Sequence, residues 1–269
     1  MRLNDARILL TGASGGLGQA LAQALAREGA SLLLVGRDQN KLAALALGLP
    51  GGARSIATLA VDLNQPAEVA RLAREAENFG VDVLINNAGI NAFGLFEQRD
   101  WSCAADVLET NLAAPMRLTH ALLPLLRARD HAAILNIGST FGSLPFPGFI
   151  AYSSAKAGMK GFSQALRREL SDSQVEVLYV APRAIDTPLN SAAVNALNAE
   201  LGSRHDTPER AARQIIAALA AGRSETHLGF PERLFAWING VAPALIDRAL
   251  APKLAVVKRH ANVASPGSR

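Results

Sequence analysis

Four polar side chains that can bind or transfer a proton are spaced as if they belonged to one catalytic site. Tyr152 and Lys156 stand four positions apart, Ser139 precedes the tyrosine by thirteen positions, and Asn111 lies further upstream. On a helix, positions i and i+4 project from one face, so the phenol and the ammonium would share one environment. A free tyrosine has a pKa of about 10, and a positive charge about 4 Å away would lower it by roughly three units. We therefore expect Lys156 to bring the pKa of Tyr152 toward neutrality.

A glycine-rich turn lies near the start of the chain. Residues 7–11 predict a short buried strand, the glycines of residues 12–18 follow it directly, and residues 19–28 predict a helix that stops at Gly29. Glycine lets the backbone approach a pyrophosphate closely, and the first amides of a helix favour negative charge. A turn of this kind also fits a simple tight connection, but its place at the opening of an alternating β/α chain favours a nucleotide site.

Together these motifs resemble those of the short-chain dehydrogenase/reductase family. They are Thr11-Gly12-x-x-x-Gly16-x-Gly18, Asn86-Asn87-Ala88-Gly89, Asn111, Ser139 and Tyr152-x-x-x-Lys156, in the family's order over about residues 5–230. The resemblance implies hydride transfer between a nicotinamide and a carbonyl or alcohol carbon. It implies that Tyr152 donates the proton, Ser139 binds the substrate oxygen, Lys156 holds the nicotinamide ribose, and Asn111 anchors a water that links Lys156 to solvent.

The resemblance also implies which residues contact the cofactor. Besides Tyr152 and Lys156, they are Gly12, Ser14, Gly16, Leu17, Gly18, Asn87, Ala88 and Gly89, and beyond the sixth strand Pro182, Ile185 and Thr187. The family usually has glycine after that proline, whereas this chain has Arg183. Arg183 could reach an acidic substrate group, but we favour a side chain that points to solvent.

The ends of the second and third predicted strands bear on the choice of cofactor. Gly36 occupies what resembles the acidic position of NAD-binding folds, and Arg37 follows it. An arginine there can bind a 2′-phosphate through charge-assisted hydrogen bonds, so we expect NADP(H) to be preferred and NAD(H) to be possible. Alternatively, Arg37 is a solvated loop charge beside a helix cap, Asp38. Asp62 and Leu63 resemble the pair that contacts adenine, although Asp62 could equally cap the following helix.

Alternation of apolar strands with alanine- and leucine-rich helices predicts an α/β fold. We expect a Rossmann-type doubly wound sheet of about seven parallel strands with helices on both faces. A single catalytic domain would cover residues 1–230, and residues 231–269 would form a C-terminal helical extension whose last residues are disordered. The predicted strands are Ile8–Thr11, Ser31–Val35, Ser55–Val61, Val83–Asn86, Ala133–Ile137, Val175–Val180 and Thr226–Leu228.

Composition limits the classes of function. With 49% hydrophobic and 19% charged residues over 269 positions, the chain has the composition of a folded α/β domain. Cys103 is the only cysteine and the five histidines lack ligand spacing, so we expect no metal. The net charge of +4 comes without a run of Lys and Arg, which argues against nucleic-acid binding. We expect a cytoplasmic protein, because the first strand starts almost at once and no apolar run reaches the length of a membrane span.

The substrate side and the extension leave several interpretations open. Phenylalanines 93, 96, 141, 146 and 149, with Leu144, predict a hydrophobic pocket, although about half of such residues would be ordinary core, and residues 189–201 predict an apolar lid. The extension is both apolar and basic, so it could cap the pocket, lie in an oligomer interface or contact an anionic membrane surface. We favour the first two, because Pro231, Pro243 and Pro252 prevent one long amphipathic helix.

The motifs predict an NADPH-dependent reductase of a hydrophobic ketone or 3-oxoacyl compound. By resemblance to the family, we expect a homodimer or homotetramer. One alternative is an NAD-dependent alcohol dehydrogenase working in the oxidative direction, because the same residues catalyse both directions. An alternative of another class is a cofactor-binding regulator or scaffold that turns nothing over.

Overall fold

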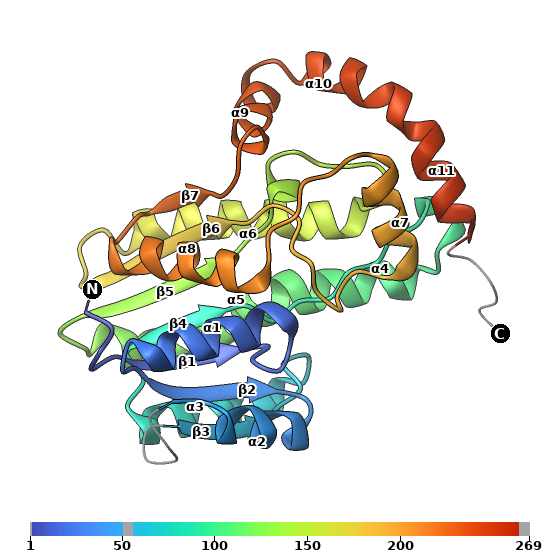
Figure 1. The fold of residues 1–269 in the computed structure, drawn as a ribbon. Coiled ribbons are helices and arrows are strands. Elements are labelled where there is room, and N and C mark those ends of the chain that lie inside the picture. The colour runs from blue at the N-terminus through green and yellow to red at the C-terminus, as the bar shows by residue number, and fades with distance from the viewer. Residues whose placement is uncertain (1, 51–55, 264–269) are drawn as a thin grey trace.

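The computed structural model describes residues 2–50 and 56–263 of the chain. Seven strands form one sheet in which every neighbouring pair is parallel, in the order β3-β2-β1-β4-β5-β6-β7 (Figure 1). This confirms the predicted fold. The strands are β1 (Arg7–Thr11), β2 (Ser31–Gly36), β3 (Ile56–Ala60), β4 (Val83–Asn86), β5 (Ala132–Ile137), β6 (Val175–Ala181) and β7 (Glu225–His227).

The predicted strands differ from the observed ones by about one residue at their ends. The seventh begins and ends one residue earlier than predicted, and the third ends at Ala60 rather than Val61. The predicted start of the third strand, Ser55, lies outside the described residues. These shifts are small because the apolar run, which the sequence displays directly, decides where a buried parallel strand lies.

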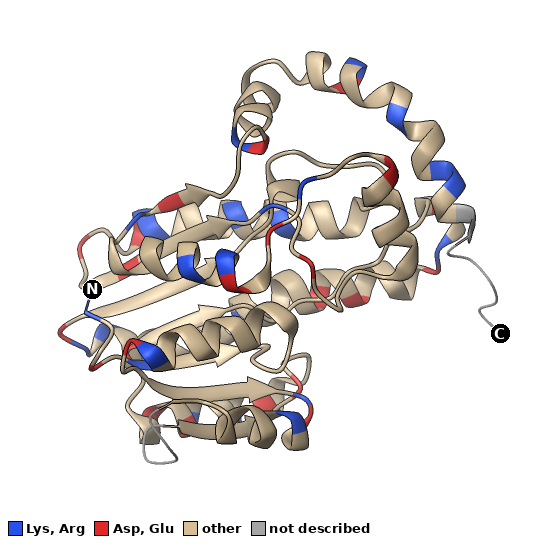
Figure 2. Ribbon diagram, in the orientation of Figure 1, with Lys and Arg blue, Asp and Glu red and all other residues tan. Residues whose placement is uncertain are grey.

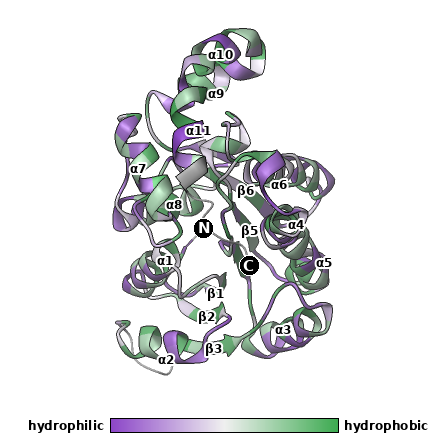
Figure 3. Ribbon diagram, turned by 90° about the vertical axis from the view of Figure 1, so that its right-hand side faces the viewer, coloured by the Kyte–Doolittle hydropathy of each residue, from purple (hydrophilic) through white to green (hydrophobic). Residues whose placement is uncertain are grey.

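Helices cover both faces of the sheet (Figure 3). Successive strand residues point to opposite faces, so Ile8 and Leu10 pack in one buried cluster and Leu9 in the other. The first cluster includes side chains of α1 (Gly16–Arg27), α2 (Gln39–Leu47) and α8 (Pro208–Ala220). The second face carries α3 (Pro66–Phe79), α4 (Trp101–Leu108), α5 (Ala114–Arg127) and α6 (Ile150–Glu169).

The direction in which the chain winds changes between β1 and β4. The chain passes from β1 outward to β2 and β3, then returns to β4 and continues outward on the other side. Ligands of open α/β sheets bind where the strand order reverses, beyond the carboxyl ends of the strands. The glycine loop follows β1 and residues 87–90 follow β4, so both motifs lie at this point.

The C-terminal extension forms an arch of separate helices above the catalytic end of the sheet (Figure 1). It contains α9 (Glu232–Val241), α10 (Pro243–Leu250) and α11 (Leu254–Val263), and α11 packs beside α7 (Ala192–Glu200). Pro243 stands at the start of α10 and Pro252 in the turn before α11, as expected for residues that interrupt a helix. None of the helices within 2–50 and 56–263 is long and apolar enough to cross a bilayer. The predicted disorder of the last residues concerns 264–269, which lie outside the described part.

Candidate active site

The glycine loop is packed so tightly that side chains at three of its positions would collide with neighbours. Gly12 has a φ of 64°, and a Cβ there would lie 2.7 Å from Cα of Ala88. A Cβ on Gly18 would lie 2.1 Å from the Gly12 carbonyl oxygen, and one on Gly16 would lie 2.9 Å from Cγ2 of Thr187. The loop therefore contacts both the β4 segment and the segment after β6, as the sequence motifs require.

The start of α1 is suited to a phosphate. Its first residue is Gly16, three residues earlier than predicted, so Gly16, Leu17 and Gly18 form the first turn of the helix. No side chain caps this turn, which is also true of other helices such as α3 and α6. Uncapped amides at a helix N-terminus bind anions. The residues present therefore fit the pyrophosphate of a dinucleotide.

Hydrogen bonds hold the residues after β4 against the glycine loop. The Thr11 hydroxyl accepts from the backbone amides of Asn87 and Ala88, each at 3.0 Å. The Asn87 side chain donates to the carbonyl oxygens of Thr11 at 3.0 Å and Gly12 at 3.2 Å. This brings Asn87, Ala88 and Gly89 to the nucleotide end of the sheet, where the sequence places them.

Tyr152 and Lys156 share one face of α6, as their spacing predicts. The Lys156 ammonium lies 5.8 Å from the centre of the Tyr152 ring and donates a 2.9 Å hydrogen bond to the Ile137 carbonyl oxygen. Lys156 is only 5% exposed, while Tyr152 is half-buried. The two side chains therefore meet at the end of β5.

The expected lowering of the Tyr152 pKa is not found. Burial raises the pKa of Tyr152, and a hydrogen bond with the Ser139 side chain only partly offsets this. Burial also lowers the pKa of Lys156, to about 8. The expectation was wrong because it counted the attraction between phenolate and ammonium but not the desolvation that disfavours both charged forms. In this arrangement the phenol carries its proton at neutral pH, which suits a proton donor.

Asn111 lies in a single π-helical turn, Glu109–Ala113, between α4 and α5. Such turns interrupt the regular hydrogen bonding of a helix and are frequent at functional sites. The buried Asn111 amide exchanges two 2.8 Å hydrogen bonds with the backbone of Ile90. A Cβ on Gly89 would lie 3.1 Å from Oδ1 of Asn111 and 3.9 Å from Nζ of Lys156. The side chains of Asn111 and Lys156 therefore both lie beside Gly89, whose missing Cβ leaves space between them.

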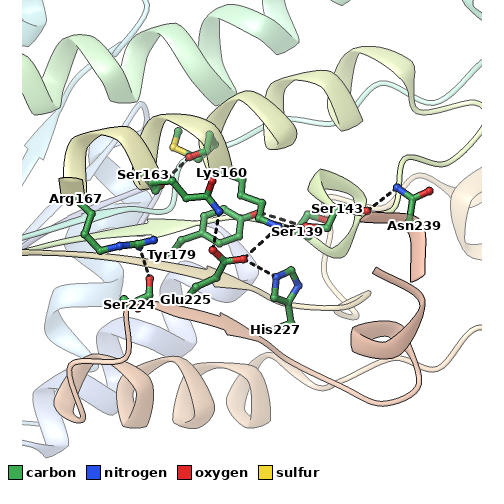
Figure 4. Close-up of polar contacts among 12 residues, drawn as sticks. Ser139, Ser143, Lys160, Ser163, Arg167, Tyr179, Ser224, Glu225, His227 and Asn239 are labelled. Atoms are coloured by element: carbon green, nitrogen blue, oxygen red, sulfur yellow. Dashed lines mark hydrogen bonds and ion pairs between the residues drawn. The ribbon is translucent and has the colours of Figure 1, made fainter. Parts of the chain in front are cut away.

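Ser139 is held in place from behind by Tyr179, a residue that the sequence motifs do not include. Tyr179 is fully buried, and its hydroxyl lies 3.5 Å from the Ser139 carbonyl oxygen (Figure 4). A Cβ on Gly138 would lie 2.2 Å from the Tyr179 ring, and one on Gly142 would lie 2.9 Å from its hydroxyl. The sequence does not single out Tyr179, because it stands in an otherwise apolar strand. Only the fold shows that Tyr179 packs against Gly138 and Gly142.

A polar network near this tyrosine reaches the C-terminal arch. Lys160 bonds the Ser143 hydroxyl at 3.0 Å and pairs with Glu225 at 3.2 Å (Figure 4). Desolvation opposes ionisation of Glu225, but bonds from Gln164, His227 and Lys160 prevail and lower its pKa to about 2. The Asn239 amide of α9 donates to the Ser143 carbonyl oxygen at 3.0 Å. The segment that carries Ser139 is thus tied to α6, β7 and α9.

Both interpretations of Arg183 are wrong. Its guanidinium makes two hydrogen bonds, of 2.8 and 2.7 Å, to the carboxylate of Asp206, and its side chain is 10% exposed. Glu232 at the start of α9 lies 4.0 Å away. The arginine therefore neither points to solvent nor is free for a substrate. A β-bridge between Asp206 and Ile185 brings Asp206 to it, and the sequence does not reveal this contact between positions 185 and 206.

Other predicted cofactor residues lie at the same edge of the sheet. The Pro182 carbonyl oxygen accepts from the Thr140 amide at 2.9 Å, which joins this segment to the one carrying Ser139, and Thr187 contacts the glycine loop. Leu63 is buried, and Asp62 accepts from the Asn64 amide at 3.0 Å without capping α3. Arg37 is exposed after β2, and Asp38 caps α2 as anticipated. Ser14 lies close to Gly36, because a Cβ on Gly36 would be 3.1 Å from the Ser14 hydroxyl oxygen.

Aromatic rings form one wall beside Tyr152. Phe141 meets the Tyr152 ring edge to face at 6.3 Å and packs against Phe146 and Phe149, while Phe93 packs against Phe149. Val194 and Leu197 of α7 and Val257 of α11 join the same cluster. Phe96 differs from the expectation because it is 52% exposed and lies outside this cluster. The rings beside Tyr152 are therefore partly core, and the hydrophobic pocket stays a prediction.

Comparison with known proteins identifies the family. The family model for short chain dehydrogenases matches residues 6–198. The chain belongs to the short-chain dehydrogenase/reductase family. It is therefore an NAD(P)-dependent oxidoreductase. Its fold is also that of a short chain dehydrogenase from Burkholderia cenocepacia J2315 solved in complex with NADP, with a TM-score of 0.80, 24% identity and coverage of 93% of this chain and 99% of that one.

Two curated relatives show how far the similarity extends. Dehydrogenase/reductase SDR family member 7B of Bos taurus is 33% identical over 93% of this chain and 82% of its own length. The 3-oxoacyl-(acyl-carrier-protein) reductase FabG of Escherichia coli (strain K12) is 34% identical over 68% of this chain and 75% of its own length. The first of these alignments takes in most of the chain, including much of the C-terminal extension.

Proposed function

We propose that the protein is an NADPH-dependent reductase that converts a ketone or 3-oxoacyl-type carbonyl into a secondary alcohol. The observation that carries this proposal is the position of Tyr152 beside the buried Lys156 ammonium, at the same edge of the sheet as the start of α1, which no side chain caps. Burial raises the pKa of Tyr152, so its phenol can act as a proton donor. A proton donor and an anion-binding helix end at one edge of the sheet are what a carbonyl reduction requires.

Each residue then has a physical task. A nicotinamide held at this edge of the sheet would supply the hydride that the carbonyl carbon accepts. Ser139 binds the carbonyl oxygen and orients it toward Tyr152, which donates its proton as negative charge develops on that oxygen. Lys156 stabilises the phenolate left behind and can bind the nicotinamide ribose, and Asn111 is close enough to connect it to solvent through water.

NADPH is the proposed cofactor because of Arg37. It is exposed directly after β2 and makes no ion pair with any described carboxylate, so its guanidinium is free to bind a 2′-phosphate. NAD(H) remains the alternative cofactor, since Gly36 removes the side chain that would accept the ribose hydroxyls but does not exclude NAD.

The proposed substrate is a hydrophobic carbonyl or acyl compound. The aromatic wall beside Tyr152 supports an apolar substrate, and similarity to the 3-oxoacyl reductase FabG supports an acyl chain. We also propose a cytoplasmic enzyme that acts as a homodimer or homotetramer, as the resemblance to the family implies.

The test is a survey of turnover followed at the absorbance band of the reduced nicotinamide. NADPH and NADH are each combined with a panel of ketones and 3-oxoacyl thioesters, and NADP⁺ and NAD⁺ with the matching alcohols. We expect the largest kcat/KM for NADPH with an apolar carbonyl. Preferred alcohol oxidation with NAD⁺ would instead support the dehydrogenase alternative. Cofactor binding without any turnover would support the regulator.

A further inference from the structure

The helix α9 turns its polar side toward the body of the protein. Glu232 lies 4.0 Å from Arg183, the Asn239 amide bonds the Ser143 carbonyl oxygen, and Ala236 is buried. These residues are spaced by four and three positions, so they lie on one face of the helix. The face of α9 that contacts the body therefore carries a carboxylate and an amide as well as a methyl group.

The opposite side of α9 is apolar and exposed. Leu234, Trp237 and Val241 are spaced by three and four positions and lie about half a turn away from the body-facing residues. They are 43%, 65% and 63% exposed. Phe230, just before α9, and Leu245 of α10 are 66% and 57% exposed. We call Phe230, Leu234, Trp237, Val241 and Leu245 the tail surface. A surface helix normally buries its apolar stripe, so this reversed arrangement marks a surface that contacts a partner.

All of the chain's excess positive charge lies in the same segment. Residues 231–269 contain six Lys and Arg against two acidic residues, which equals the net charge of +4 of the whole chain, so residues 1–230 are balanced. Arg233, Arg248, Lys253 and Lys258 are exposed, and none of them pairs with a carboxylate within the described part of the chain. Figure 2 shows these cations distributed along the arch.

We propose that the tail surface docks on the face of an anionic lipid bilayer. Short helices with exposed Trp, Phe and Leu and nearby Lys and Arg lie in the plane of a membrane, where the rings enter the interface and the cations meet lipid phosphates. None of the described helices is both long and apolar enough to span a bilayer, and α9 and α10 have only 10 and 8 residues, so these two helices would lie on the membrane rather than cross it. The arch would then hold the aromatic side of the active site toward the bilayer, from which an apolar substrate can come.

Charge argues against a second copy on this surface, and the contacts of α9 argue against a lid. A two-fold contact between copies brings the same patch of each copy together, so two segments of net charge +4 would repel each other. A lid would turn its apolar side toward the protein, but α9 contacts the segment carrying Ser139 through Asn239. The prolines favour a pocket cap or an oligomer interface, but their positions do not show which face of α9 is buried.

The test is co-flotation of the full chain with vesicles of phosphatidylcholine alone or with 30% phosphatidylglycerol at low salt. We expect binding to the anionic vesicles only, reduced by salt. The double variant Leu234→Gln/Trp237→Gln should lose about tenfold or more of this binding. Leu47→Gln/Trp101→Gln, which removes the same side-chain types at other exposed positions, should keep it. Circular dichroism shows whether each variant remains folded.

Fluorescence places the contact independently. Trp101 and Trp237 are the only tryptophans, so in Trp101→Phe all tryptophan emission comes from Trp237. We expect its emission to shift to the blue on addition of anionic vesicles.

A chain that stays in solution with both vesicle types would overturn the proposal, as would equal loss of vesicle binding in both double variants. Conversion of a dimer to a monomer by the tail variant in sedimentation velocity, without any change in flotation, would assign the surface to a second copy. Vesicle binding is measured without turnover, so its outcome is independent of the proposed reaction.

Discussion

At the scale of single residues, the site depends on an ammonium placed where water hardly reaches. Lys156 is 5% exposed and has one hydrogen bond, to the Ile137 carbonyl oxygen. Burial lowers its pKa to about 8, from 10.5 in water. The folded protein therefore pays a desolvation cost for this charge below pH 8, and the cost is relieved as the pH rises toward 10.5.

The lowered pKa of Lys156 makes the stability of the folded protein depend on pH. Between pH 8 and 10.5 the unfolded chain binds the Lys156 proton and the folded chain does not, so the free energy of unfolding rises with pH. Relative to Lys156→Met, the wild-type protein should gain up to about 3 kcal/mol across this window. Urea unfolding of both proteins at pH 7.5 and 10.5 measures the difference. A difference that does not change with pH would show that the lysine titrates as in water.

Arg37 decides the cofactor at the same scale. Arg37→Ala should raise the KM for NADPH about tenfold, the loss expected for a charge-assisted hydrogen bond to phosphate, and leave the KM for NADH unchanged. Lys41→Ala removes a neighbouring exposed cation as a control. If both variants weaken NADPH equally, the effect is one of general charge and not of direct contact.

The sequence could predict some functional residues and not others, and the difference lies in what each residue contacts. Tyr152, Lys156, Ser139 and Asn111 carry reactive groups at motif spacing, so residue type reveals them. Tyr179 does not stand out in the apolar strand Val175–Ala181, and its importance arises from two glycines on another segment. Arg183 stood out, but its partner Asp206 is assigned only by the fold.

At the scale of elements, the glycine loop joins β1, α1 and the segment after β6 through close backbone contacts. In Gly18→Ala the new methyl group would lie 2.1 Å from the Gly12 carbonyl oxygen, so we expect NADPH binding to be lost or the fold weakened. Gly161→Ala is the matched control in the middle of α6, where a Cβ meets nothing within 4 Å. It should raise stability by about 0.5–1 kcal/mol, because alanine favours a helix over glycine. Calorimetry and NADPH titration distinguish the two variants.

The pair Arg183–Asp206 fastens the segment after β6. Asp206→Asn would leave the Arg183 guanidinium, only 10% exposed, with Glu232 at 4.0 Å as its remaining carboxylate and without its hydrogen-bonded charged partner, at a cost of roughly 3 kcal/mol in the free energy of unfolding. Arg210 also approaches Asp206, at 3.4 Å, but its side chain is 60% exposed, so Arg210→Ala should cost less than about 1 kcal/mol. Denaturant titration of both variants tests this order. Equal losses of unfolding free energy in the two variants would mean that the burial of Arg183 does not strengthen its interaction with Asp206.

At the scale of the whole molecule, the parallel sheet follows from patterns that are local in sequence. Short strand-like runs, of three to seven residues, separated by helical stretches predict the doubly wound order, because crossovers are right-handed. The C-terminal arch was less predictable. Its prolines indicate where helices break, but the face that α9 buries is decided by Arg183 and Ser143, which are 49 and 96 positions away from their partners. Contacts between distant segments leave no periodicity in the sequence.

The parallel sheet brings the carboxyl ends of β1, β4, β5 and β6 to one edge, and Tyr152 lies at this edge beside the end of β5. The most direct measurement is single-turnover reduction by Tyr152→Phe, together with NADPH binding followed by nicotinamide fluorescence. Removal of one hydroxyl should leave NADPH binding within about twofold and lower the rate of reduction by about a thousandfold, as expected for loss of a general acid. Reduction at a near-normal rate by Tyr152→Phe with NADPH bound would contradict the proposed role of this tyrosine.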